Sequence, residues 1–456
     1  MALAKGISQG KKRKGEESMN LIYGIKDKPK FGQVVLFALQ QLLAIMAATI
    51  AVPAIVGNGM SASAAMFGAG VGTIVYLLFT KSASPVFLGS SFAFIGPMFS
   101  AFGGGVAVAT GYAGLIIGAG IAGLVYVILA IFVKISGVKW IDKLMPPVII
   151  GPTVAIIGLS LAGNAIGDLM TSSVEGGSVY VCLICGLVTL FVTVLTSTYG
   201  KNMAKLIPFI IGILAGYFCA SIFALIGKNT GNESLVVINY AALHQVGTII
   251  SLPDFTFLKA DWSGVNGAYL LTLFVAYAPV AFVVFAEHLA DHKNLSSIVG
   301  VNLLEEPGLT RTLLGDGIGS FVGAFFGGCP NTTYGESIAT VAITRNASTI
   351  SIWGAAIACI LFSLITPLVA FLETIPNCVM GGVCIALYGF IASSGLKMLQ
   401  PVDLNKNRNL FVASVIFIVG VGGMTVNFGR VEIRTVACAL ILGILTNVML
   451  SKEKDE

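Results

Sequence analysis

The stretch GGCPNTTYGES at positions 327–337 decides the fold, because it is polar and interrupted while its flanks are apolar. Pro330 lacks an amide hydrogen and Gly335 permits close backbone approach, so a continuous helix is disfavoured here. Lipid cannot hydrogen-bond a broken backbone, so such a segment persists at membrane depth only inside protein or beside a water-filled cavity. We infer that Glu336, an ionisable residue in this stretch, helps to hold a small polar solute halfway across a membrane.

The composition places the chain among polytopic membrane proteins. Of its 456 residues, 56% are hydrophobic and only 10% are charged, whereas soluble domains carry about 25% charged residues. The 55 glycines fit close helix packing in lipid. The eight cysteines lie mostly inside apolar runs, so we expect no disulfide framework, no metal site and no cofactor. A nucleic-acid partner is also not expected.

A membrane helix needs about 20 largely apolar residues, and the sequence predicts fourteen crossings. Twelve are apolar runs, at 33–53, 62–80, 113–133, 145–166, 178–198, 206–227, 266–290, 312–328, 348–372, 377–395, 410–428 and 433–450. The other two, near 84–101 and 330–344, are short or interrupted.

The distribution of Lys and Arg supports this count and sets the orientation. With alternating sides, all but four of the 26 basic residues fall on the side of the N-terminus; the exceptions are Lys228, Lys259, Arg430 and Arg434. Cytoplasmic loops are enriched in Lys and Arg. We therefore expect a multi-pass protein of the cytoplasmic (inner or plasma) membrane with both termini in the cytoplasm. The basic N-terminus does not read as a typical cleaved signal peptide.

The long loop near the middle divides the chain into two halves of seven segments. We expect a basic cytoplasmic tail at 1–32, a first repeat at 33–227, an extracellular loop at 228–265, a second repeat at 266–450 and a cytoplasmic tail at 451–456. An odd number of crossings per half inverts the second half in the membrane. The interrupted segment is third in each half, and such matched pairs indicate a transporter's binding site.

Two more carboxylates, Glu287 and Asp291, lie at the end of the apolar run that begins near 266. Their i, i+4 spacing puts them on one helical face, and His288 and His292 lie on a face about 100° away. A buried carboxylate can accept N–H groups of a ligand or exchange a proton. Simple solvation at a cytoplasmic helix end is the alternative for Asp291, and it is the favoured interpretation for the two histidines.

Other polar residues have plainer interpretations. Asp316 is expected to begin a helix, where it would cap or hydrogen-bond locally. Phe92 in the first interrupted segment could stack on a planar ring, although most of the 28 Phe residues are packing residues. A membrane metalloenzyme using Glu287, His288, Asp291 and His292 is a remote alternative, since His-x-x-x-His places two imidazoles on one face. A membrane protein with a purely structural role is a second remote alternative.

Several motifs resemble the bacterial uracil-permease branch of the nucleobase–ascorbate transporter family, also called nucleobase:cation symporter-2. The most specific is PNTTYGE at 330–336, followed by AITR at 342–345. Similar elements are GSSFAFI at 89–95, AEH at 286–288, Pro376 with MGGV at 380–383, and LYG at 387–389. The resemblance runs from about residue 33 to 450.

This resemblance implies an all-α polytopic fold of fourteen segments in two inverted repeats, with core and gate domains and short strands in segments 3 and 10. It implies a non-enzymatic transporter that imports uracil with protons and forms a homodimer. Glu287 and Glu336 would hydrogen-bond the pyrimidine. The substrate pocket would also include Phe92, Tyr334 and Gly335, and Tyr388 would join Asp291 and Glu336 in the proton-coupling network.

Two positions depart from the family's pattern. Where its uracil permeases have a histidine one turn after the first glutamate, this chain has Asp291, and where Gln-His is frequent in the first segment it has Gln40-Gln41. Both changes affect groups associated with proton coupling. A xanthine, guanine, other nucleobase or anion transporter of the same fold is the alternative within transport.

Overall fold

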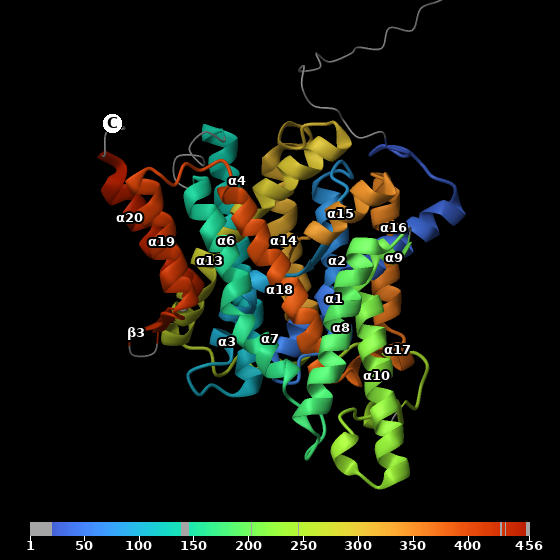
Figure 1. Ribbon diagram of the computed structural model, residues 1–456. Coiled ribbons are helices and arrows are strands. Elements are labelled where there is room, and N and C mark those ends of the chain that lie inside the picture. Colours follow the sequence, from blue (N-terminus) through green and yellow to red (C-terminus); the bar gives the residue numbers. More distant parts are fainter. Residues whose placement is uncertain are drawn as a thin grey trace, which may run out of the picture.

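The computed structural model describes residues 21–137, 146–201, 203–244, 246–428, 431–433 and 435–452. Most of the expected tail at 1–32 and of the tail at 451–456 lies outside these residues. Figure 1 shows a helical molecule in which the described chain begins and ends at the same face.

The first half runs in the order α1 (Phe31–Val56), α2 (Ala62–Phe79), β1 (Leu88–Ser90), η1 (Phe92–Phe94), α3 (Ile95–Ala101), α4 (Val108–Ser136), α6 (Pro147–Ser160), α7 (Ala162–Leu169), α8 (Val179–Tyr199), α9 (Met203–Leu206) and α10 (Pro208–Thr230). The central loop holds η2 (Glu233–Leu235), α11 (Ala241–His244) and α12 (Thr256–Lys259).

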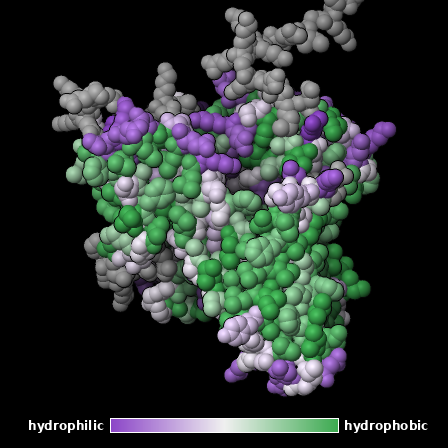
Figure 2. All heavy atoms as spheres, viewed as in Figure 1, coloured by the Kyte–Doolittle hydropathy of each residue, from purple (hydrophilic) through white to green (hydrophobic). Residues whose placement is uncertain are grey.

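The second half comprises α13 (Gly267–Val299), η3 (Leu304–Gly308), α14 (Leu309–Gly327), β2 (Asn331–Thr333), α15 (Gly335–Thr344), α16 (Thr349–Ser363), α17 (Thr366–Glu373), α18 (Asn377–Leu399), α19 (Asn407–Val421), β3 (Val426–Phe428), β4 (Val431–Ile433), α20 (Thr435–Met449) and η4 (Leu450–Lys452). Among the described residues, eight helices are long and apolar enough to cross a membrane, and Figure 2 shows the broad apolar surface on one side.

The helices pack into two groups, which confirms the expected core and gate. In the core, α2 packs on α14 and α16, and α4 packs on α13 and α14. In the gate, α18 packs on α6 and α8, α8 on α10, and α19 on α6 and α20. Each of these groups combines segments from both halves of the sequence. The residue boundaries of the two repeats stay a prediction.

Short strands lie in both interrupted segments, as expected. β1 and β2 pair antiparallel, with Leu88 opposite Thr333 and Ser90 opposite Asn331. The pairing is extended by hydrogen bonds from the amide of Ser91 to the carbonyl of Pro330 (2.9 Å) and from the amide of Tyr334 to that of Phe87 (3.3 Å). Each broken segment thus supplies the backbone partners that lipid cannot.

Glycines let α2 and α14 approach closely enough to support the strands. A methyl group at Gly68 would overlap the carbonyl oxygen of Gly323, and Gly72 and Gly323 leave room for the side chain of Asn331. That side chain donates from Nδ2 to the carbonyl of Gly68 at 2.9 Å. The helix pair therefore anchors β2 by direct contact.

Several predicted boundaries were wrong. The predicted run 348–372 is divided into α16 and α17. The predicted run 145–166 is confirmed as one apolar span, Pro147–Leu169, which consists of the consecutive helices α6 and α7. The predicted run 410–428 ends as a helix at Val421, and a hairpin of β3 and β4 follows. Gly423, with a φ of 69°, lies between the helix and the hairpin, and such a conformation favours a helix stop. Helix α13 continues to Val299, nine residues beyond its predicted end.

We expect the substitution G68A to destabilise the protein by about 1–3 kcal/mol, because the added methyl group forces α2 away from α14. The matched control is G120A in α4, where a methyl group would meet only the Phe321 ring at 3.5 Å, an ordinary contact. Thermal unfolding of the purified proteins in detergent compares the two. Equal melting temperatures for G68A and the parent would contradict this account of the packing.

Candidate substrate-binding site

The cavity that contains the predicted site residues has a volume of about 470 Å³. Its walls come from the two strand-to-helix junctions, from α13 in the core, and from α6, α8, α10 and α18 in the gate. It extends from the strands to Lys205 and Lys397, two exposed residues. The cavity therefore lies between core and gate, where a relative movement of the two groups would change its access.

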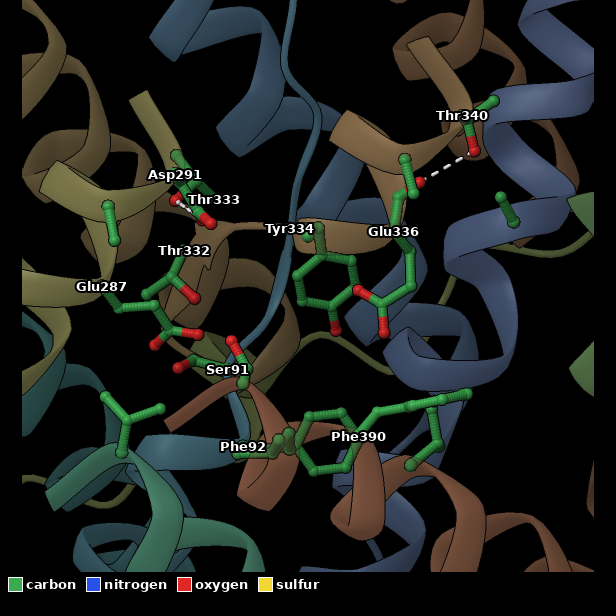
Figure 3. A pocket seen from close by; sticks show the side chains of 18 of the residues that line it. Ser91, Phe92, Glu287, Asp291, Thr332, Thr333, Tyr334, Glu336, Thr340 and Phe390 are labelled. Atoms are coloured by element: carbon green, nitrogen blue, oxygen red, sulfur yellow. Dashed lines mark hydrogen bonds between the residues drawn. The ribbon is translucent and has the colours of Figure 1, made fainter. Parts of the chain in front are cut away.

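The structure places Glu287 and Asp291 on the same wall of this cavity, one turn apart on α13. Asp291 accepts a hydrogen bond of 2.7 Å from the hydroxyl of Thr333 in β2. Figure 3 shows this bond and shows the Glu287 carboxylate directed into the cavity near Ser91. Asp291 is thus tied to a strand inside the molecule, and simple solvation at a helix end is excluded.

Glu336 lies on the opposite wall, in the first turn of α15. Figure 3 shows its carboxylate across the cavity from Glu287, with Tyr334 between them. No side chain caps the start of α15, so its first amide groups are available to a ligand. Gly335, at the first position of the helix, is exposed and has no neighbouring atom within 4 Å of a Cβ position. A planar solute could approach the backbone closely there.

Tyr334 is buried and holds the two strands together rather than projecting freely. Its hydroxyl donates to the carbonyl of Ser90 at 2.6 Å, and its ring fills the space that a side chain at Gly89 would need. Phe92 lies at the junction of β1 and α3 on the cavity wall. Its ring meets Tyr388 of α18 edge to face, with centroids 5.8 Å apart.

Tyr388 is buried, and its hydroxyl has no hydrogen-bond partner in the described part of the chain. It contacts the site through Phe92 and does not join a polar network that includes Asp291 or Glu336. The neighbouring residues Leu387, Phe390 and Ile391 line the cavity. In this structure Tyr388 therefore packs between gate and core. Its part in proton coupling stays a prediction.

Both histidines of α13 are buried on the side away from the cavity, so the expected solvation was wrong. His288 pairs through Nδ1 with Oδ2 of Asp316 at 2.8 Å and through Nε2 with the hydroxyl of Thr312 at 3.0 Å. His292 meets the hydroxyl of Tyr76 at 2.7 Å. These partners are on α14 and α2, so the histidines do not form a metal site with Glu287 and Asp291.

Asp316 also differs from its expected role. It lies in the middle of α14, 1% exposed, rather than at a helix start. Its carboxylate contacts His288 on α13. Spacing within the sequence cannot predict such a contact between two helices. The glycines on either side of it, Gly315 and Gly317, allow close packing of α14 on α2 and α4.

Several cavity residues were not singled out from the sequence, among them Ser91, Thr332, Thr333 and Phe390. The first three flank predicted residues in the strands, and the alternation of side chains in an extended segment could have suggested Thr333 as a partner of a neighbouring helix. Phe390 is two residues from Tyr388 on α18. Nothing in its local sequence distinguishes it from the other phenylalanines.

The arrangement suits a small planar ligand that carries both N–H donors and carbonyl acceptors. Carboxylates from two walls can accept N–H groups, and the free amides of α15 can donate to carbonyl oxygens. Phe92 and Phe390 add apolar surface beside them. Charge-assisted bonds of this kind are stronger than neutral ones, so two opposed carboxylates can orient such a ligand.

Comparison with known proteins gives relatives that cover nearly the whole chain. The chain is 38% identical to a uracil permease of Bacillus caldolyticus over 432 residues, which is 94% of this chain and 94% of that protein. It is 38% identical to a uracil permease of Escherichia coli (strain K12) over 424 residues, 92% of each. It is 28% identical to a putative pyrimidine permease, RutG, of the same strain, over 93% of this chain and 90% of that protein.

Solved structures support the fold. The murine anion transporter Slc26a9 in an inward-facing state matches with a TM-score of 0.65 at 12% identity, over 93% of this chain and 69% of that one. The transmembrane domain of the cyanobacterial bicarbonate transporter BicA matches with a TM-score of 0.59 at 15% identity, over 93% and 99%. These similarities concern the fold alone.

A family model described as "Permease family" (Xan_ur_permease) matches residues 32–429. This range begins at the first membrane helix and includes both strands, α13 and the whole cavity wall. Together with relatives at 38% identity, the match shows that the chain belongs to the Xan_ur_permease family of permeases, a conclusion that confirms the resemblance found in its motifs.

Proposed function

We propose that this protein imports uracil across the cytoplasmic membrane together with protons. The observation that carries the proposal is the pair Glu287 and Glu336, which face each other across a cavity between core and gate. Relatives named uracil permeases, 38% identical over more than 90% of the chain, support uracil as the substrate.

The cavity matches the hydrogen-bonding groups of the pyrimidine. Uracil carries two ring N–H donors and two carbonyl acceptors. The carboxylates of Glu287 and Glu336 would accept the N–H groups, while the backbone amides near Phe92 and Gly335 would donate to the carbonyl oxygens. Phe92 and Tyr334 would pack against the ring. All of these residues line the same cavity.

Access to the site would alternate through movement of the core against the gate. A second cavity of about 190 Å³ shares Phe92, Ala93 and Ile157 with the substrate cavity and extends towards Asn164 and Thr435. These three shared residues form the barrier between the two cavities. The larger cavity reaches the face where the described chain begins and ends. We assign that face to the cytoplasm, so this form is inward-facing.

Proton coupling would use the carboxylates of the cavity. Protonation of Asp291 or Glu336 lowers the number of buried negative charges, whose desolvation is costly. The loaded core would then move against the apolar gate with a smaller electrostatic penalty. The hydrogen bond from Thr333 to Asp291 links this exchange to β2, which also borders the substrate.

We also propose a homodimer in the bilayer, following the family resemblance. Helices α8 and α10 suit such a role or lipid contact, because only 33% and 28% of the residues in their membrane-length apolar stretches are buried within the chain. Cross-linking in native membranes would detect the dimer.

Radiolabelled uracil uptake into proteoliposomes tests the proposal directly. We expect accumulation driven by an inward proton gradient, stronger at lower external pH, and competition by unlabelled uracil but not by xanthine or guanine. The absence of competition by uracil would reject uracil as the substrate and favour a different nucleobase or an anion.

We expect E287Q and E336Q each to weaken uracil binding roughly 10–150-fold, because a hydrogen bond to a charged group contributes about 1.5–3 kcal/mol. Binding to purified protein gives the dissociation constants. The control is E373Q in α17, an exposed glutamate away from the cavity, which should bind like the parent. If both E287Q and E336Q bind uracil as tightly as the parent, the two glutamates do not bind the pyrimidine.

We expect D291N to keep uracil exchange across the vesicle membrane but to lose proton-driven accumulation, since an amide cannot exchange the proton. Exchange and net uptake, measured between pH 5.5 and 8, separate the two effects. If neither D291N nor E336Q changes the pH dependence of uptake, protons are coupled through other groups.

A further inference from the structure

The residues before α1 form a non-helical segment, residues 21–30, which we call the N-terminal strap. It crosses the chain where α15 ends. The amides of Ile22 and Tyr23 donate to the carbonyl of Arg345, the C-cap residue of α15, at 2.8 and 3.3 Å. The amide of Ala347 donates to the carbonyl of Tyr23 at 2.8 Å. The strap is thus hydrogen-bonded to the residues that directly follow α15.

Further hydrogen bonds join the strap to the start of α16. The hydroxyl of Ser348 donates to the carbonyl of Asp27 at 2.7 Å. Thr349 donates to the carbonyl of Ile25 from its amide and from its hydroxyl, each at 3.2 Å. Figure 1 shows the strap in dark blue beside α15 and α16. It therefore follows the connection between these two helices and is held there in one register.

The inner face of the strap adds apolar contacts. Leu21 and Ile25 pack against a buried cluster that includes Ile338 and Val341 of α15. Helix α15 has ten residues, so it is about 15 Å long. Its first turn carries Glu336 at the cavity, and its last turn is followed by the strap. A short helix transmits a shift at one end to the other, so the strap helps to set the position of Glu336.

The outer face of the strap is apolar and basic. Ile22 is 62% exposed, and Phe31, the first residue of α1, is 84% exposed. Between them in the sequence lie Lys26, Lys28 and Lys30, which are also exposed. Exposed apolar residues interspersed with lysines are typical of a segment at a membrane interface, where lysines reach the headgroups and apolar side chains enter the acyl region.

Most of the strap's positive charge is not neutralised by the protein. Lys28 and Lys30 form no ion pair with any residue that the structure describes. Lys26 lies 3.9 Å from Glu306, but both side chains are mostly exposed, so this pair is weak. The carboxylate of Asp27 accepts a backbone amide of the strap itself. The lysines therefore suit an anionic partner, and anionic lipids attract basic segments next to a membrane helix.

We propose that the N-terminal strap binds anionic phospholipid headgroups of the cytoplasmic leaflet, and that this binding stabilises the position of α15. The effect on transport rests on the proposed function, because α15 carries Glu336. Lipid favours the docked strap, and uracil favours the same position of α15. By linkage, each then increases the affinity for the other by the same factor.

Thermal unfolding of the purified full chain in detergent, without uracil, tests the lipid site by itself. We expect added phosphatidylglycerol to raise the melting temperature by about 3 °C relative to added phosphatidylcholine. The variant K28Q/K30Q should lose this difference and should unfold like the parent in phosphatidylcholine, because both lysines are exposed and unpaired. The matched control K134Q/K201Q removes two exposed charges from the same face outside the strap, and it should respond as the parent does.

Uracil binding to the protein in nanodiscs tests the link to α15. We expect a dissociation constant about fivefold lower with phosphatidylglycerol in the bilayer than with phosphatidylcholine alone, and K28Q/K30Q should lose this difference. The variant I25A, which loosens the strap from α15, should bind uracil with the lower affinity in both bilayers.

A melting temperature that does not depend on phosphatidylglycerol overturns the proposal. A full response in K28Q/K30Q also overturns it, because the lipid then acts elsewhere, and so does an equal effect of soluble glycerol phosphate, because a free anion is then sufficient. Equal uracil affinity of the parent in both bilayers overturns the coupling to α15. A lipid effect on melting that requires Lys28 and Lys30 supports the lipid site even if uracil does not bind, so a failure of the proposed function is recognised separately.

Discussion

The pairing of β1 with β2 is the interaction on which the rest of the structure depends. Two membrane segments break their helices at the same depth, and each leaves backbone groups that lipid cannot satisfy. The antiparallel pairing satisfies them, and it leaves the residues that follow β1 and the start of α15 at the cavity. The close contact of α2 and α14, made possible by glycine, is needed because Asn331 anchors β2 to that helix pair. The substrate site therefore lies where the two broken segments satisfy each other's backbone hydrogen bonds.

Helix α13 serves two environments at once. One face carries Glu287 and Asp291 to the cavity, where water and a solute can reach them. A second face, about 100° away, carries His288 and His292 into contacts with α14 and α2. These buried contacts fix the rotation of α13 about its own axis, so they determine where Glu287 and Asp291 lie.

Much of the architecture could be predicted from the sequence, because membrane helices follow local rules. The length of apolar runs and the placement of Lys and Arg predicted the segments, and Pro330 and Gly335 predicted the break at β2. The spacing of Glu287 and Asp291 predicted a shared face. The division of one run into α16 and α17 was missed because both helices are apolar. The hairpin was missed because β3 lies at the end of the predicted run 410–428 and β4 is only three residues long.

The sequence by itself determined the class of protein, the two interrupted segments and the carboxylates at membrane depth, since each follows from composition or from spacing within one segment. Only the tertiary structure decided which residues meet. The contacts of Thr333 with Asp291, of His288 with Asp316 and of Phe92 with Tyr388 each join residues from different segments. Such contacts depend on helix rotation and depth, which packing sets, and no periodicity within a single segment encodes them.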